Sequence, residues 1–175
     1  MAVKTFLALS FFVAALSCCV GNVIWGAKIG ELQSGVLLGE VPQTSPKLVR
    51  CVIYLADRST NKVPRKLYAP AKEELLKVEL FDSQGNPVKG LVKYGKPLRR
   101  YSRNQTRRLR VITPPPGDEV SVEFFDPRDI FAVNHIGNYT LSVELRILQD
   151  FGGDELEPLV FPTIKTNIFL LPKVK

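Results

Sequence analysis

Apolar and polar residues alternate along much of this chain beyond residue 48. The longest alternation runs from Tyr139 to Leu148, where apolar residues are separated by Thr, Ser, Glu and Arg. Successive side chains of a strand point to opposite faces, so this period of two predicts a strand with one buried face. The same pattern predicts four more inward-facing sets: Val49, Cys51, Ile53 and Leu55; Leu76, Val78 and Leu80; Val120, Val122 and Phe124; Ile164, Ile168 and Leu170.

Turn-forming residues separate these predicted strands. Gly, Pro, Asn and Asp gather at residues 82–87, 114–118 and 151–154, where each favours a tight change of chain direction. Shorter strands are expected near residues 88–94 and 108–112.

Residues 22–47 show no sustained period, and several Gly and Pro residues interrupt them. This composition predicts a linker that contains one short strand at residues 35–41. A brief helical period covers residues 71–76. The remaining pattern, over residues 48–175, predicts an all-β domain: a single antiparallel sandwich of about seven to eight strands, with a barrel as the alternative.

Residues 1–21 are expected to form a secretory signal. After Lys4 the chain is uncharged and largely apolar as far as Val20, which is the order of regions typical of a signal peptide. Three outcomes fit this segment: cleavage after Ser17, lipidation of Cys18 at a site resembling a lipobox, or an uncleaved anchor over residues 5–25. We therefore expect an exported protein, either periplasmic, in the cell envelope or secreted, that is tethered to a membrane in two of these outcomes.

The chain has three cysteines, Cys18, Cys19 and Cys51. Alternation places Cys51 inside the domain, where a free thiol behaves as a small hydrophobic group. If Cys18 is lipidated, a disulfide between Cys19 and Cys51 is the alternative.

The segment Gly137-Asn138-Tyr139-Thr140-Leu141 resembles the start of strand F in immunoglobulin-like and fibronectin type III-like domains. The resemblance implies an immunoglobulin-like sandwich in which Tyr139 has a structural role, its hydroxyl bonding to the backbone of the preceding corner. Leu141 stands where antibody-type domains have a cysteine, and Trp25 precedes the predicted sandwich. The resemblance therefore indicates a superfamily and no particular family.

The sequence favours a protein without catalytic activity, cofactor or metal. His135 is the single histidine, no nucleophile motif accompanies it, and zinc sites need three or four His or Cys ligands. The acidic turn around Asp126 and Asp129 allows three readings: a calcium site, a hydrolase that uses these carboxylates, or side chains that cap the turn or pair with Arg128.

Residues 96–110, called the basic segment below, hold seven basic residues and no acidic residue. Arginine predominates, which suits bidentate contacts with phosphate, sulfate or carboxylate. The candidate anion-binding residues are Arg99, Arg100, Arg103, Arg107 and Arg108. An anionic glycan, an anionic lipid surface and an acidic protein are the expected partners, and nucleic acid is a less suitable partner for an exported chain. The alternative is a solvated loop and edge strand whose charges oppose strand pairing between molecules.

These features predict an exported binding or structural domain without catalytic activity. Two alternatives remain: an accessory or inhibitor domain that acts on an extracellular enzyme, and the hydrolase described above.

Overall fold

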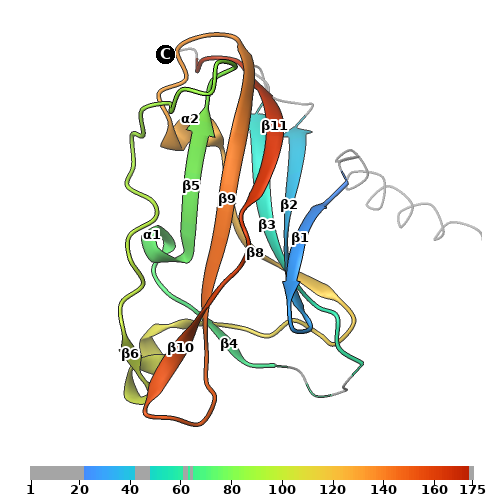
Figure 1. Ribbon diagram of the computed structural model, residues 1–175, viewed down its shortest axis with the longest axis vertical. Coiled ribbons are helices and arrows are strands. Elements are labelled where there is room, and N and C mark those ends of the chain that lie inside the picture. The colour runs from blue at the N-terminus through green and yellow to red at the C-terminus, as the bar shows by residue number, and fades with distance from the viewer. Residues whose placement is uncertain (1–21, 42–47, 61–62, 64, 174–175) are drawn as a thin grey trace, which may run out of the picture.

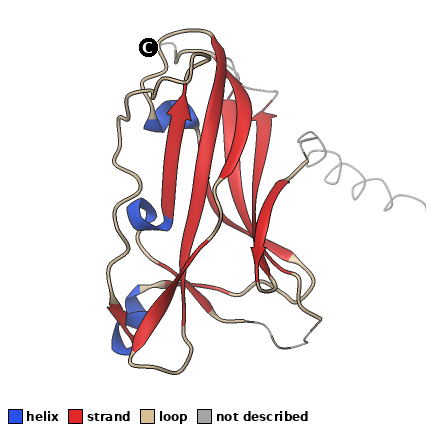
Figure 2. Ribbon diagram, viewed as in Figure 1, coloured by secondary structure: helices blue, strands red, loops and turns tan. Residues whose placement is uncertain are grey.

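The computed structural model describes residues 22–41, 48–60, 63 and 65–173. The predicted signal, with Cys18 and Cys19, lies outside the described residues. Within them, no helix has the length and apolar character needed to cross a membrane. Strands predominate and the helices are short (Figure 2).

The first sheet is antiparallel and has the strand order β1-β2-β3-β8. Its strands are β1 (Ile24–Ile29), β2 (Leu32–Val41), β3 (Leu48–Asp57) and β8 (Glu119–Phe125). The short strand predicted at residues 35–41 lies within β2. The rest of the predicted linker is wrong for β1 and for residues 32–34, because β1 pairs with β2 and β2 pairs with the whole length of β3. The alternation of apolar and polar side chains is interrupted there by glycine. A Cβ at Gly35 would lie 2.7 Å from the Trp25 ring, so the close packing of this ring excludes a side chain at residue 35.

The second sheet is built around β9 (Gly137–Gln149), the longest strand (Figure 1). The strands β5 (Leu76–Phe81) and β11 (Ile164–Leu170) flank its first part. The strands β4 (Leu67–Ala69) and β10 (Glu155–Val160) flank its second part. Two short strands extend this lower end: β6 (Tyr101–Ser102) pairs with β10, and β7 (Arg110–Ile112) pairs with β4.

The described residues thus form eleven strand segments, more than the seven to eight predicted. The additional ones include β4 and β6, which have three and two residues and are too short to show a period. Three short helices lie in the connections: α1 (Lys72–Leu75), the 3-10 helix η1 (Arg103–Arg108) and α2 (Pro127–Ile130). The helix α1 lies inside the predicted helical stretch at residues 71–76.

The inward faces of both sheets contribute to one hydrophobic cluster. Four of the five predicted inward sets are confirmed, and their members are all buried: Val49, Cys51, Ile53, Leu55, Leu76, Val78, Leu80, Tyr139, Leu141, Val143, Leu145, Ile147, Ile164, Ile168 and Leu170. The all-β class is therefore confirmed.

The fifth predicted set is wrong at Phe124, which is 63% exposed, whereas its neighbour Phe125 is 6% exposed. The cause is a β-bulge in β8. Ile53 pairs with Glu123 and the next residue of β3, Tyr54, pairs with Ser121, so β8 carries one extra residue at this point. Such an extra residue reverses the alternation beyond it.

The predicted strand at residues 88–94 is also wrong. The N–H of Val88 donates to Leu80 O at 2.8 Å and the N–H of Gly95 donates to Leu76 O at 2.9 Å, so both ends of the segment bond to the edge of β5. Between them the chain turns away to bond α2, where the N–H of Leu91 donates to Ile130 O. Because of this detour, residues 88–94 do not form a regular ladder of hydrogen bonds with β5.

Tyr139 lies at the corner before β9. Its side chain is buried and its hydroxyl donates a hydrogen bond to His135 O at 2.8 Å. The bond ties the start of the central strand to the turn before it.

We expect Tyr139→Phe to lower the free energy of unfolding by about 0.5–1.5 kcal/mol, the usual net value of one such bond. Denaturant unfolding measures this loss. Tyr68→Phe is the matched control, because Tyr68 is also a buried residue and its hydroxyl makes no hydrogen bond with a described residue. Equal midpoints for Tyr139→Phe and the parent protein would contradict the expectation.

The bulge predicts opposite results for two adjacent residues. Phe125→Ala removes a buried ring and should cost about 3–5 kcal/mol of unfolding free energy. Phe124→Ala removes an exposed ring and should change it by about 0.5 kcal/mol or less. Thermal or denaturant unfolding of both variants distinguishes this register from uninterrupted alternation, which predicts the reverse order.

Candidate functional site

The basic segment runs along one side of the second sheet and turns at the lower end of the molecule in Figure 1. Its strand β6 pairs with β10 through Tyr101 opposite Leu156 and Ser102 opposite Glu155. The helix η1 follows, and the segment then enters β7. The segment is therefore part of the fold for much of its length.

An apolar contact holds this course. Tyr101 is buried in a small cluster with Tyr68, Leu148 and Leu156, on the side of the sheet away from the main core. Leu98 and Leu109, which bracket the arginine-rich stretch, pack against the same cluster. The two leucines thus hold the two ends of the stretch whose arginines are exposed to solvent.

Local hydrogen bonds form the turn at η1. The side chain of Gln105 accepts a hydrogen bond from the N–H of Ser102 at 3.0 Å, which satisfies a donor that the helix start leaves free. The hydroxyl of Thr106 donates to Arg103 O at 2.9 Å, and the N–H of Leu109 donates to Thr106 O at 3.0 Å.

The buried carboxylate of Glu74 anchors the start of the segment. It accepts hydrogen bonds from Arg99 Nε at 2.6 Å, from the Tyr101 hydroxyl at 2.9 Å and from the Arg99 N–H at 3.3 Å. The hydrogen bonds of Tyr101 and Glu74 raise the pKa of Arg99 above its ordinary value. Burial, followed by the hydrogen bond to Glu74, raises the pKa of Tyr101.

Two further arginines tie down the rest of the segment. Arg103 Nε lies 3.0 Å from Asp150 Oδ2, and the Arg103 N–H donates to Asp154 O at 2.9 Å. Arg110 Nη2 donates to Val122 O at 2.5 Å and lies 4.0 Å from a carboxylate oxygen of Glu123. These contacts join the segment to both sheets.

The five predicted anion-binding arginines are all exposed, but they differ in their partners. Arg99 and Arg103 pair with Glu74 and Asp150, as described above. The other three, Arg100, Arg107 and Arg108, have no carboxylate of any described residue within ion-pair distance. The structure therefore divides the predicted set into two anchors and three free cations.

Sequence reasoning missed Glu74 and Asp150, the acids that hold the anchors. They lie 25 and 47 residues from their arginines, so no local pattern joins them. It also missed the acidic neighbours of the segment: Asp154, just before β10, and Glu155 and Glu157 of β10 are exposed. The surface at this end therefore carries both signs of charge.

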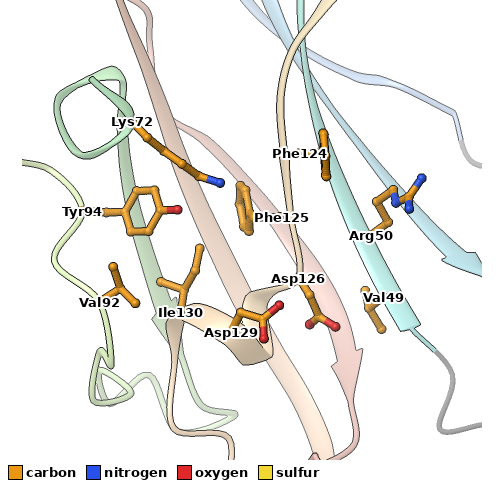
Figure 3. A pocket seen from close by; sticks show the side chains of 10 residues that line it. All are labelled: Val49, Arg50, Lys72, Val92, Tyr94, Phe124, Phe125, Asp126, Asp129 and Ile130. Carbon is orange, nitrogen blue, oxygen red and sulfur yellow. The ribbon is translucent and has the colours of Figure 1, made fainter. Parts of the chain in front are cut away.

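A pocket of about 320 Å³ lies at the other end of β8 (Figure 3). Its apolar lining includes Tyr94, Phe125 and Ile130, with the Tyr94 and Phe125 rings 6.5 Å apart between centroids. Lys72 and Arg50 supply positive charge at its rim, and Arg50 lies 5.6 Å over the exposed Phe124 ring. Figure 3 shows the Lys72 ammonium directed between Tyr94 and Phe125.

The acidic turn is engaged in structural contacts. Asp126 caps α2 by accepting a hydrogen bond from the Arg128 N–H, and its carboxylate has three hydrogen-bond contacts with the Arg128 guanidinium at 2.7–3.1 Å. Asp129 pairs with Lys173. Over the described ranges, no group of three or more His, Cys, Asp or Glu is placed to hold a metal ion.

Cys51 is buried, and burial raises the pKa of its thiol. It forms no disulfide with any described residue. His135 is exposed and contributes its backbone carbonyl to Tyr139.

Comparisons with protein-family models, with curated proteins and with solved structures give no match to this chain.

We expect Glu74→Gln to loosen the start of the basic segment, because the amide keeps the shape of the carboxylate but loses its charge toward Arg99. Cleavage by trypsin after Arg99 or Arg100 should become about three-fold faster or more, since local opening exposes the backbone. Glu73→Gln is the control, because its side chain has no ion pair among the described residues. Identical cleavage rates for both variants would contradict the anchoring role.

Proposed function

We propose that this chain is an exported, non-catalytic binding domain with an immunoglobulin-like sandwich fold, and that its basic segment binds a linear anionic glycan. Two antiparallel sheets that share one core, together with the corner hydrogen bond of Tyr139, support the fold assignment. The signal-like pattern of residues 1–21 supports export.

The observation that carries the binding proposal is the state of Arg100, Arg107 and Arg108. Each is exposed without a carboxylate partner among the described residues, yet the chain on either side is held by ion pairs and apolar contacts. Cations fixed in this way lose less conformational freedom when a ligand binds, which favours affinity. Their guanidinium groups suit sulfate and carboxylate groups of a glycan.

The neighbouring acids favour a linear ligand over a lipid surface. Asp154, just before β10, and Glu155 and Glu157 of β10 are exposed, and Glu155 lies opposite Ser102 of β6. A flat anionic membrane would face these carboxylates together with the arginines and would be repelled by them. A single anionic chain can follow the arginines and leave the acids in water.

The hydrolase alternative has less support. Asp126 is buried in its ion pair with Arg128, so its carboxylate is not available to accept a proton from substrate or water. The alternative of an accessory or inhibitor domain for an extracellular enzyme requires no particular arrangement of Asp126 and Arg128. No contact described above favours this alternative.

Heparin serves as the test ligand. We expect the triple variant Arg100→Gln, Arg107→Gln and Arg108→Gln to bind heparin about ten-fold more weakly than the parent protein, and binding by the parent to fall as salt rises. Isothermal titration calorimetry at two ionic strengths measures both effects.

The control variant carries Lys89→Gln, Lys93→Gln and Lys165→Gln, three exposed cations outside the basic segment. It loses the same net charge, so an equal loss of heparin binding would show that net charge alone is responsible. That result, or full binding by the arginine variant, contradicts the proposal.

A further inference from the structure

The pocket beside β8 has the dimensions and lining of a site for a small ring. Its volume of about 320 Å³ is at the lower end of the range for ligand pockets. Tyr94, Phe125 and Ile130 form an apolar floor, and the exposed ring of Phe124 extends it at the rim (Figure 3). The detour of residues 88–94 away from β5 supplies one wall through Val92 and Tyr94.

The charges around this pocket are unequal. Each of its two carboxylates has a cation of its own, Arg128 for Asp126 and Lys173 for Asp129. Of the two cations in the lining, Arg50 forms no ion pair with a described residue. Lys72 Nζ lies 3.2 Å from Glu123, a carboxylate outside the lining that also lies 4.0 Å from Arg110 Nη2. A pocket in which acids are neutralised and cations are in excess favours an anionic ligand.

Lys72 keeps its charge at this position. Burial opposes the charge of its ammonium group, but the hydrogen bond and the charge of Glu123, aided by Tyr94, outweigh that effect and raise the pKa of Lys72. Its side chain is 41% exposed, so the ammonium can turn from Glu123 toward a second anion. The group is therefore protonated at neutral pH and within reach of a ligand.

We propose that this pocket binds an aromatic ring that carries a carboxylate, with the ring against Tyr94, Phe125 and Ile130 and the carboxylate at the Lys72 ammonium. The site is separate from the basic segment and goes beyond the glycan binding proposed above. Two sources share this chemistry: a free aromatic acid and the C-terminal aromatic residue of a peptide.

Amide chemical shifts of the isotope-labelled protein test the site with matched probes. 3-Phenylpropionate and phenethylamine carry similar rings and opposite charges. We expect the acid to shift the amide signals of Phe125, Ile130 and Tyr94, and to bind about three-fold more tightly than the amine or better. Equal binding of the two probes, or shifts confined to other parts of the protein, would overturn the proposal.

Two peptides separate the sources. Gly-Gly-Phe ends in a free carboxylate, and its C-terminal amide keeps the ring without the charge. Tighter binding of Gly-Gly-Phe than of 3-phenylpropionate, with loss of binding by the amide, assigns the site to a peptide terminus. Binding of 3-phenylpropionate alone assigns it to a free acid. If neither acid binds, the proposal is wrong.

A variant pair checks the role assigned to the ammonium. Lys72→Gln should weaken 3-phenylpropionate binding about three-fold or more. Lys77→Gln removes the same charge from a lysine that is 42% exposed and pairs with Glu79, away from this pocket, and should leave binding unchanged. Equal affinities of the two variants for 3-phenylpropionate would overturn the proposal, and heparin binding by Lys72→Gln should stay at the parent value.

Discussion

The strand β9 pairs with four other strands of the second sheet and so holds both ends of that sheet together. Its first part pairs with β5 and β11, and its second part pairs with β4 and β10. Near its end, Ile147 is buried in the main core, whereas the next residue, Leu148, is buried in the smaller cluster on the opposite face. Tyr101 covers Leu148 there, and the basic segment takes its position from that contact.

Charge and packing act together on the basic segment. Exposed ion pairs alone contribute little to stability, so Arg103 and Asp150 could not hold a free loop in place. Glu74 differs because it is buried and accepts hydrogen bonds from both Arg99 and Tyr101. A buried carboxylate without these donors would be strongly unfavourable, which makes the arrangement specific. The three remaining free arginines are then presented by a scaffold that has already been ordered.

Alternation along the sequence predicted β3, β5, β11 and the first part of β9, with most of the core, because each of these segments buries one set of alternate residues. It failed at Phe124, where a bulge shifts the register by one residue, and at β1 and the first residues of β2, where Gly35 accommodates the Trp25 ring instead of a side chain of its own. The sequence shows the cluster of arginines directly. It does not show which arginines are paired and which are free, because Glu74 and Asp150 reach Arg99 and Arg103 only through the tertiary structure.

The central claim is that the basic segment is an ordered part of the fold that presents fixed cations. Amide hydrogen exchange tests it most directly, since the N–H of Arg103 donates to Asp154 O and the N–H of Leu109 donates to Thr106 O. If the segment is ordered, these two amides exchange far more slowly than in an unstructured peptide and are protected about as well as the amides of β10. Exchange of both amides at the rate of an unstructured peptide, while the amides of β9 stay protected, would show that the basic segment is a flexible loop and not an ordered part of the fold.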